Sequence, residues 1–367
     1  MKQILFCSSF IYNSSNGASI FSRVLLQWAE NRQVKLDIIT SEELNDLTFI
    51  PLVKSNHLVK KIPVLEAYQR SYLYFKTIQA QLKSNNYDFI LFNNVIESLH
   101  SSKLITEIPI YAFLHDENFM NDYYPNPGLK RKWYRQTMKK LEQKAARQLN
   151  RIFTNSLFMK RQIESIYKIE EKLIDFFYFT SLDLKSKKIG KELLSEKSVI
   201  HILFIKHDYK RGGFSLLNEA IRSIKSPKII LRAIGPEQGN HNTLTSDQHV
   251  VEIYENRSRQ EIENDFQWAD IFCTPSFSEA MGIGNFEAMK NHVPIVAQNI
   301  PVNQEFNRYA EIMFTSDYDD QASLTQAILD CIHNDTKRIN LINEAAKFHE
   351  NYLDKDFIFK KLDQYLL

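Results

Sequence analysis

Short apolar runs alternate with longer amphipathic stretches along most of the chain. The amphipathic stretches have helical period, as in residues 18–30, where one side is apolar. The apolar runs suit buried strands, and they lie at residues 3–8, 35–40, 88–92, 110–114, 151–154, 173–179, 199–205, 229–234, 250–254, 271–274, 294–297 and 312–315. This alternation predicts parallel sheets covered by helices, the doubly wound α/β class.

Further helices are predicted between and after these strands. A short helix is expected after residues 35–40, and longer ones are expected at residues 65–83, 129–148, 322–333, 338–348 and 357–365. Residues 155–156 supply an Asn-Ser cap for one more helix.

The alternation is interrupted once, at residues 180–197, where Ser, Lys, Gly and Glu replace the aromatic runs. Such a change of composition is typical of a linker. With 367 residues the chain is long enough for two domains. We therefore predict a first domain over residues 1–179, a linker over 180–197, a second domain over 198–350 and a C-terminal helix within 351–367.

Composition excludes some partners and suggests a compartment. A net charge of +2 with 25% charged residues gives no argument for nucleic acid. The three cysteines lack metal or redox spacing, which favours buried thiols in a reducing compartment. The apolar run at the start is too short for a signal peptide, and no later segment approaches a membrane span. We expect a cytoplasmic protein.

Polar residues follow several predicted strands of the first domain. In doubly wound sheets ligands bind beyond the carboxyl ends of the strands, so these residues should face one crevice. They are Asn93, Asn94, His115 and Asp116, and Gly17 lies in the polar loop after the first strand. The loop at residues 117–128, rich in polar and aromatic residues, would suit an acceptor-binding loop or equally a surface connection.

The strongest candidate chemistry in the second domain follows the predicted strand at residues 271–274. Glu279 and Glu287, eight residues apart, bracket Gly282 and Gly284 where a loop gives way to a helix. Backbone amides at a helix start favour an anion such as a diphosphate. Phosphate at the helix with carboxylates beside it fits a sugar nucleotide.

A second loop in this domain follows the strand at residues 199–205. It combines three cations with paired glycines: Lys206, Lys210, Arg211, Gly212 and Gly213. Lysine and arginine supply donors and positive charge, and glycines admit close approach, so a diphosphate clamp is a credible interpretation. A plain surface turn can have the same composition. Gly235 opens another loop on the same side, after the strand at residues 229–234.

The stretch around the two glutamates resembles the signature of retaining glycosyltransferase family 4, Glu-Gly-Phe-Gly-(Leu/Ile)-Pro-x-x-Glu-Ala-Met, followed by Gly-Val-Pro-Val-Val-Ala. The matching residues are Glu279, Gly282, Ile283, Glu287, Ala288, Met289 and 293–297. The departures are Ala280, Met281, Gly284 and His292, which stand where the signature has Gly, Phe, Pro and Gly. None of them removes a charged group.

The basic loop resembles the second signature of this family, a strand ending Val-Gly-Arg followed by Asp-(Phe/Tyr)-x-Arg-Lys-Gly-Gly. Residues 208–213 match it with the two cations interchanged and the variable position missing. Lys206 and His207 stand where Gly-Arg is usual, which changes the details of the phosphate contact but retains its charge.

The resemblance implies a GT-B architecture, in which two Rossmann-like domains face each other across a cleft and the C-terminal helix packs back on the first domain. It implies transfer of a hexosyl group from a nucleotide diphosphate sugar to a glycan or lipid-linked acceptor, with retention of anomeric configuration. UDP is the expected nucleotide, on family frequency alone.

The resemblance also implies roles for individual residues. Glu287 would bind the ribose hydroxyls and Glu279 the donor sugar's hydroxyls. Lys210 and Arg211 are positively charged, so they would neutralise the diphosphate together with Lys206. Gly282 and Ile283, which match the signature, would line the donor site, as would Gly17 and Gly235, which lie in loops after predicted strands. His115 would hydrogen-bond the transferred sugar or the acceptor, since it matches the His of a family His-Asp pair.

No metal or other cofactor is expected, because cationic side chains beside the phosphates replace a divalent ion. Asp317 and Asp319 have the Asp-x-Asp form of the GT-A metal site, but they precede a predicted helix, where acids serve as caps.

Three alternatives remain open. A noncatalytic GT-B partner or chaperone subunit would share the fold, and an epimerase or phosphorylase would share the two domains. The basic amphipathic helix at residues 129–148 can lie on the inner, anionic face of a membrane, although a packing helix with a solvated face is more frequent.

Overall fold

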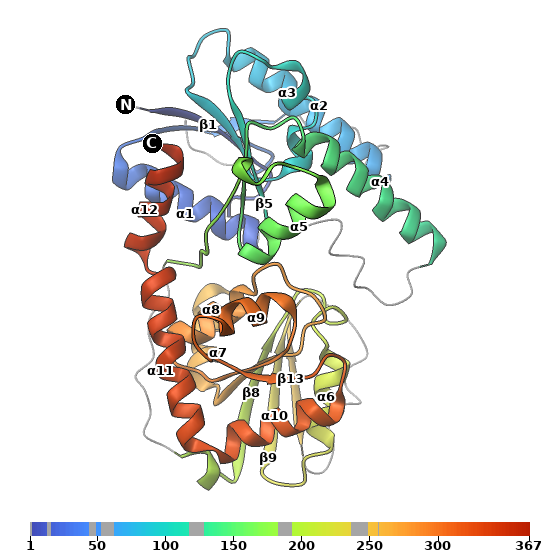
Figure 1. Cartoon of the computed structure of the whole chain (residues 1–367), viewed down its shortest axis with the longest axis vertical. Helices are drawn as coiled ribbons and strands as arrows, with labels where there is room; N and C mark the ends of the chain where they lie inside the picture. The colour runs from blue at the N-terminus through green and yellow to red at the C-terminus, as the bar shows by residue number, and fades with distance from the viewer. Residues whose placement is uncertain are drawn as a thin grey trace. The chain divides into compact units, whose positions relative to one another are not determined.

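The computed structural model describes residues 2–12, 16–43, 49–52, 62–116, 128–182, 193–235, 249–255 and 257–367. The chain forms two compact units. Unit 1 comprises Met1–Thr180 and Lys355–Leu367, and unit 2 comprises Ser181–Asp354 (Figure 1). Most of the predicted linker, residues 183–192, lies outside the described residues.

Unit 1 is built on a seven-stranded parallel sheet with the order β3-β2-β1-β4-β5-β6-β7. Its strands are β1 Gln3–Ser8, β2 Lys35–Thr40, β3 Phe49–Pro51, β4 Phe89–Phe92, β5 Ile110–Leu114, β6 Arg151–Thr154 and β7 Ile174–Phe176. The chain runs outward from β1 in one direction and from β4 in the other. The carboxyl ends of β1 and β4 therefore form the switch point at which doubly wound sheets bind ligands.

The helices of unit 1 include a segment from the far end of the chain. They are α1 Gly17–Arg32, α2 Pro63–Gln81, α3 Ser101–Leu104, α4 Leu129–Ala146, α5 Leu157–Tyr167 and α12 Lys355–Leu366. Trp28 of α1 donates from Nε1 to Asp363 of α12 at 2.8 Å, and Arg32 pairs with the same carboxylate at 2.9 Å. These contacts hold α12 beside α1, as Figure 1 shows.

Unit 2 is built on a six-stranded parallel sheet with the order β10-β9-β8-β11-β12-β13. Its strands are β8 Val199–Ile205, β9 Lys228–Ile234, β10 Val250–Tyr254, β11 Ile271–Thr274, β12 Ile295–Gln298 and β13 Phe314–Ser316. Its helices are α6 Phe214–Arg222, α7 Arg259–Trp268, α8 Ile283–Lys290, α9 Pro301–Asn307, α10 Gln321–His333 and α11 Asp335–Tyr352. Here the switch point lies between β8 and β11.

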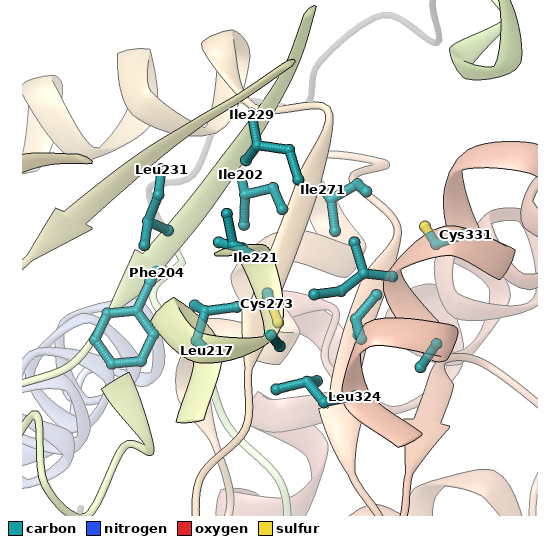
Figure 2. Packing of buried hydrophobic residues seen from close by; sticks show 14 of the residues in the cluster. Ile202, Phe204, Leu217, Ile221, Ile229, Leu231, Ile271, Cys273, Leu324 and Cys331 are labelled. Atoms are coloured by element: carbon teal, nitrogen blue, oxygen red, sulfur yellow. The ribbon is translucent and has the colours of Figure 1, made fainter. Parts of the chain in front are cut away.

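The core of unit 2 forms where apolar residues of the central strands meet α6 and α10 (Figure 2). Ile202 and Phe204 of β8 and Leu217 of α6 are fully buried, and Leu324 of α10 joins them. Burial of one such side chain stabilises the fold by about 1.5–3 kcal/mol. All three cysteines are buried free thiols, which confirms their predicted burial.

The predicted α/β class and two-sheet arrangement are confirmed, but several short elements were missed. Where a short helix was expected after β2, the described residues include the three-residue strand β3. Helices α3, α7 and α9 were not predicted, although Ser258 and Glu261 form the capping box that starts α7. Among the helices that the structure describes, none combines the length and apolarity needed to cross a membrane.

Candidate functional site

Two loops meet at the switch point of unit 2, because β8 and β11 are neighbours there. The amide of Phe277 donates to the carbonyl of Arg211 at 2.9 Å, and Nε of Arg211 donates to the carbonyl of Ser278 at 3.0 Å. The basic loop after β8 and the acidic loop after β11 are thus joined by hydrogen bonds. Arg211 is fixed at this junction.

Two glycines allow this close packing. Gly213 is the N-cap of α6 with φ +74°, and a Cβ added there would lie 2.0 Å from the carbonyl oxygen of Pro275. A Cβ on Gly235 would lie 2.0 Å from the carbonyl oxygen of Lys206. No larger residue fits either position without movement of the backbone, so contacts within the protein are sufficient to explain both glycines.

Opposite charges face each other across the joined loops. Nζ of Lys206, after β8, forms an ion pair with Oε1 of Glu279, after β11. The two side chains are 18% and 11% exposed, so both reach the surface only in part. This places a cation and a carboxylate together at the carboxyl edge of the sheet.

Glu287 lies in α8 and forms a second ion pair. Nη1 of Arg259 donates to its Oε1 at 2.6 Å, and the Glu287 side chain is only 7% exposed. Arg259 is the first residue of α7, directly after the Ser258 cap. Arg259 was not among the predicted site residues. The capping box was the available signal, because it fixes where α7 begins and which residue occupies its first turn.

The start of α8 has the geometry expected for anion binding. Gly282 occupies the N-cap with φ +78°, and no side chain caps the helix. The amides of the first turn, which includes Ile283, therefore carry the partial positive charge of the helix end. This is the arrangement that binds phosphate groups in other proteins.

Neutral side chains hydrogen-bond the backbone of the acidic loop, and they were not among the predicted site residues. Nε2 of the fully buried Gln298 donates to the carbonyl of Pro275, and its Oε1 accepts from the amide of Asp319 at 2.6 Å. Asn303 in turn donates to the carbonyl of Gln298 at 2.9 Å. Uncharged amides occur throughout protein sequences, so nothing in the sequence distinguished these.

The Asp-x-Asp sequence is placed differently from the prediction that it caps a helix. The residue that caps α10 is Asp320, whose side chain accepts from the amide of Ser323 at 2.9 Å. Asp317 and Asp319 lie exposed in the turn before it.

In unit 1 the residues at the strand ends are mostly neutral. Nδ2 of Asn93 donates to Ser8 Oγ, Ser22 Oγ and the carbonyl of Ala18, each at 2.9 Å. These three acceptors fix the orientation of the Asn93 amide, so its Oδ1 must be the partner of Nε2 of His115, at 2.7 Å. Nε2 of His115 therefore carries the proton, and Nδ1 is an acceptor.

The ring of His115 lies among aromatic side chains. It stacks on Phe113 with ring centroids 4.2 Å apart and also contacts Phe21 and Phe179. Burial lowers the pKa of His115 to about 3. Nδ1 is buried and accepts no hydrogen bond from any residue that the structure describes. Neutral His115 thus has one acceptor available.

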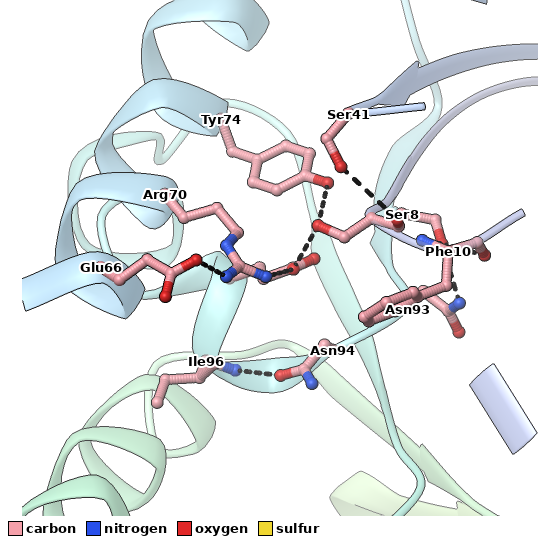
Figure 3. Close-up of polar contacts among 11 residues, drawn as sticks. Ser8, Phe10, Ser41, Glu66, Arg70, Tyr74, Asn93, Asn94 and Ile96 are labelled. Atoms are coloured by element: carbon pink, nitrogen blue, oxygen red, sulfur yellow. Dashed lines mark hydrogen bonds and ion pairs between the residues drawn. The ribbon is translucent and has the colours of Figure 1, made fainter. Parts of the chain in front are cut away.

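A second polar cluster in unit 1 was not predicted (Figure 3). Ser9 Oγ donates to Oε1 of the buried Glu97 at 2.6 Å and also lies 3.0 Å from the hydroxyl of Tyr74. Arg70 pairs with Glu66 at 2.6 Å and approaches Glu97 at 3.6 Å. Burial raises the pKa of Glu97, and the charge of Arg70 opposes that rise.

The predicted site residues therefore fall in both units. Unit 2 holds, at the carboxyl edge of its sheet, Lys206, Lys210, Arg211, Gly235, Glu279, Gly282, Ile283 and Glu287. Unit 1 holds His115 at the end of β5 and Gly17 at the start of α1, where Asn16 accepts from the amide of Ser19. The proposed acceptor-binding loop, residues 117–127, lies outside the described residues.

Comparisons with known proteins cover both units. A family model described as "Glycosyl transferases group 1" matches residues 185–348, and one described as "Glycosyltransferase Family 4" matches residues 15–178. A search of curated proteins finds no match.

Solved structures with a similar fold span the whole chain. Sucrose-phosphate synthase from Thermosynechococcus elongatus superposes with a TM-score of 0.79 at 13% identity, covering 99% of this chain and 98% of that one. WaaG, a glycosyltransferase involved in lipopolysaccharide biosynthesis, gives 0.71 at 14% identity, covering 99% of each chain. Anabaena Alr3699/HepE in complex with UDP gives 0.72 at 16% identity, again covering 99% of each.

Proposed function

Because the chain belongs to the glycosyltransferases of group 1 and family 4, which have the GT-B fold, we propose that it transfers a hexosyl group from a nucleotide diphosphate sugar. The acceptor would be a hydroxyl of a glycan or a lipid-linked molecule, and the anomeric configuration would be retained. One observation carries the proposal: the basic loop and the acidic loop of unit 2 are joined beside the uncapped start of α8. UDP is the favoured nucleotide, and Anabaena Alr3699/HepE is a structural neighbour solved with UDP-glucose.

The charged groups of unit 2 suit the departure of a nucleoside diphosphate. Negative charge grows on the leaving phosphate in the transition state, and donors fixed beside it lower the barrier. The first amides of α8 supply such donors, together with Lys206, Lys210 and Arg211. Glu279 would accept hydrogen bonds from hydroxyls of the transferred sugar, and Glu287 would accept them from the ribose.

His115 would act as a neutral acceptor. Its protonated Nε2 donates to Oδ1 of Asn93, so Nδ1 would accept a hydrogen bond from a hydroxyl of the transferred sugar or of the acceptor. We assign no proton transfer to it, since its pKa of about 3 makes it a weak base.

The reaction should need no divalent cation, because cationic side chains neutralise the diphosphate. Transfer that is abolished by EDTA and restored by magnesium or manganese would contradict this proposal.

A thermal-shift screen of nucleoside diphosphates and their sugars tests the donor assignment. A ligand present at about a hundred times its dissociation constant adds about 2.7 kcal/mol of stability. UDP or a UDP-sugar should give the largest shift, and Glu287→Gln should lose most of it. Loss of the Glu287 charge weakens the ion pair with Arg259, so the shift must be compared with that variant's own unliganded melting temperature.

Two outcomes would replace the proposal. If no nucleotide stabilises the wild type, the noncatalytic partner subunit becomes the better interpretation. If NMR of the product shows inversion at the anomeric carbon, retention is wrong.

One observation favours a membrane-surface role for α4. Leu129 and Trp133, one turn apart, are 88% and 64% exposed, and Lys132 and Lys140 are exposed on the same helix. Aromatic and apolar side chains among lysines suit an anionic lipid surface. Co-sedimentation with phosphatidylglycerol vesicles should exceed that with phosphatidylcholine vesicles and should fall for Trp133→Ala. Equal sedimentation of the wild type with both vesicles would leave α4 as a packing helix.

A further inference from the structure

Arg259 connects two elements of unit 2 that are distant in sequence. It begins α7, which follows the end strand β10, and its Nη1 reaches Glu287 in α8. The Ser258 cap holds the backbone on either side: its side chain accepts from the amide of Glu261, and Glu261 accepts from the amide of Ser258. The guanidinium is therefore presented to Glu287 from a rigid helix start.

Arg259 leaves two buried donors without a hydrogen-bond partner among the described residues, whereas its neighbour Arg257 leaves one. The one hydrogen bond of Arg259 goes to Glu287, while its Nε and Nη2 are buried and have no partner among the described residues. The buried Arg338 donates to the carbonyls of Cys331 and Ile332 and pairs with Asp335. An arginine that serves packing uses its donors as Arg338 does, because unsatisfied buried donors cost free energy. Arg259 therefore needs another explanation.

The carboxylate of Glu287 shows what Arg259 does there. Oε1 accepts from Arg259, whereas Oε2 accepts from no residue that the structure describes. A carboxylate held through one oxygen keeps its rotamer and its charge, and the other oxygen can accept from a ligand hydroxyl. The side chain is only 7% exposed, so Glu287 without its cation would be a nearly buried, unpaired charge.

We propose that Arg259 is a positioning residue of the donor site, which fixes the Glu287 carboxylate so that Oε2 accepts from the ribose diol. This inference rests on the proposed function, in which Glu287 binds the ribose. Its consequence is a sugar-specificity effect. Discrimination between a ribonucleotide and a deoxynucleotide should depend on Arg259, which itself need not touch the nucleotide.

Calorimetric titration of the full-length protein with UDP, 2′-deoxy-UDP and 3′-deoxy-UDP tests the inference. The wild type should bind UDP at least about tenfold more tightly than one of the deoxy nucleotides, since a hydrogen bond to a charged group is lost. Arg259→Gln should reduce this ratio to below about threefold, mainly through weaker binding of UDP. Arg259→Lys, which retains the charge, should restore part of the ratio.

Arg257→Gln is the matched control. Arg257 lies two residues before Arg259. Its guanidinium lies over the ring of Tyr254 and pairs with Asp265, and it contacts no residue of α8 that the structure describes. This variant should keep the wild-type ratio. Melting temperatures of all variants show whether each is folded.

The outcomes separate the inference from the proposed function. If Glu287→Gln loses the ratio and Arg259→Gln keeps it, Glu287 binds the ribose without help and the inference is wrong. If Glu287→Gln also keeps the ratio, or the wild type shows none, the ribose role of Glu287 is wrong and the inference fails with it. If no nucleotide binds the wild type, the proposed function itself is overturned.

Discussion

The two units have the same kind of sheet but different chemistry at the edge where ligands bind. In unit 2 the edge carries ion pairs, Lys206 with Glu279 and Arg259 with Glu287. In unit 1 it carries mostly neutral hydrogen-bonded groups, with His115 and Asn93 at the centre, while Glu97 and Arg70 form one ion pair nearby. Charged groups suit a diphosphate, whose charge changes during the reaction, while neutral acceptors suit hydroxyls that stay uncharged. The same fold thus carries charged groups at the strand ends of one unit and mostly neutral groups at those of the other.

The largest expected effect is in the charged unit. Arg211→Ala should lower turnover about a hundredfold, comparable to the loss of one strong electrostatic donor in other enzymes. Nε of Arg211 is fixed on the carbonyl of Ser278, so its charge is held in place. Initial rates with a UDP-sugar at saturating concentration provide the measurement.

Lys210→Ala is the matched control for Arg211. Lys210 is the neighbouring cation but is exposed, so its charge is screened by water and its removal should cost less than tenfold. If Arg211→Ala leaves the rate unchanged, the diphosphate binds elsewhere. The charged groups at the strand ends of unit 2 would then serve only to stabilise the fold.

The charged unit was the easier one to predict from the sequence. Lysine, arginine and glutamate beside glycines are rare enough to be noticed, and their spacing resembled a known signature. The sequence could not show that Gly213 packs on Pro275 or that Gln298 donates to the carbonyl of Pro275, because folding brings these separate segments of the chain together. Arg259 was missed for the same reason, since its partner lies 28 residues away.

Acid should destabilise both units through histidines that are buried or partly buried. Burial lowers the pKa of His115 in unit 1 to about 3 and that of His349 in unit 2 to about 4, where Lys290 adds a smaller effect. In the unfolded chain both titrate near 6.5, so the unfolded state binds more protons as pH falls below that value. The stability is full above pH 6.5 and is lost as pH falls toward the folded pKa.

The expected loss is about 2 kcal/mol per histidine between pH 6.5 and 5. Urea unfolding at pH 7 and pH 5 should therefore show a smaller acid loss for His349→Gln than for the wild type. An identical loss would mean that the pKa of His349 is the same in the folded and the unfolded chain. Glu97 opposes the trend, because its raised pKa makes the folded state bind more protons.

A smaller effect is expected from His115 on catalysis. His115→Ala should lower kcat/KM by up to about tenfold, the value of one neutral hydrogen bond. The ratio of wild type to variant should stay constant from pH 5.5 to 8.5, because the pKa of about 3 keeps His115 neutral throughout. A ratio that changes with pH in this range would mean that His115 becomes charged at the edge of unit 1.

The fold of unit 1 was predicted from the sequence more completely than its candidate site residues. Its strands β1, β2, β5 and β6 have the predicted bounds, since buried apolar runs identify strands well. His115 and Asn93 were selected only by their place after strands, and their roles stay predictions. Ser8, Ser22 and Glu97 were missed, because a serine or a single acid in a sequence gives no sign that folding will bury it.

The smallest predicted effect concerns His292, which follows α8 where the family signature has glycine. Its φ of +53° lies in the left-handed region, which costs a side chain about 1 kcal/mol relative to glycine. His292→Ala and His292→Gly both remove the imidazole and differ only in the Cβ atom, which disfavours the left-handed conformation. The glycine variant should therefore be more stable by about 1 kcal/mol in urea unfolding. His333, exposed at the end of α10, is the control, because alanine should be the more stable of the same pair in a right-handed helix. Equal stability of the two His292 variants would show that unit 2 holds this turn without left-handed strain, and that histidine replaces the signature glycine there at no cost.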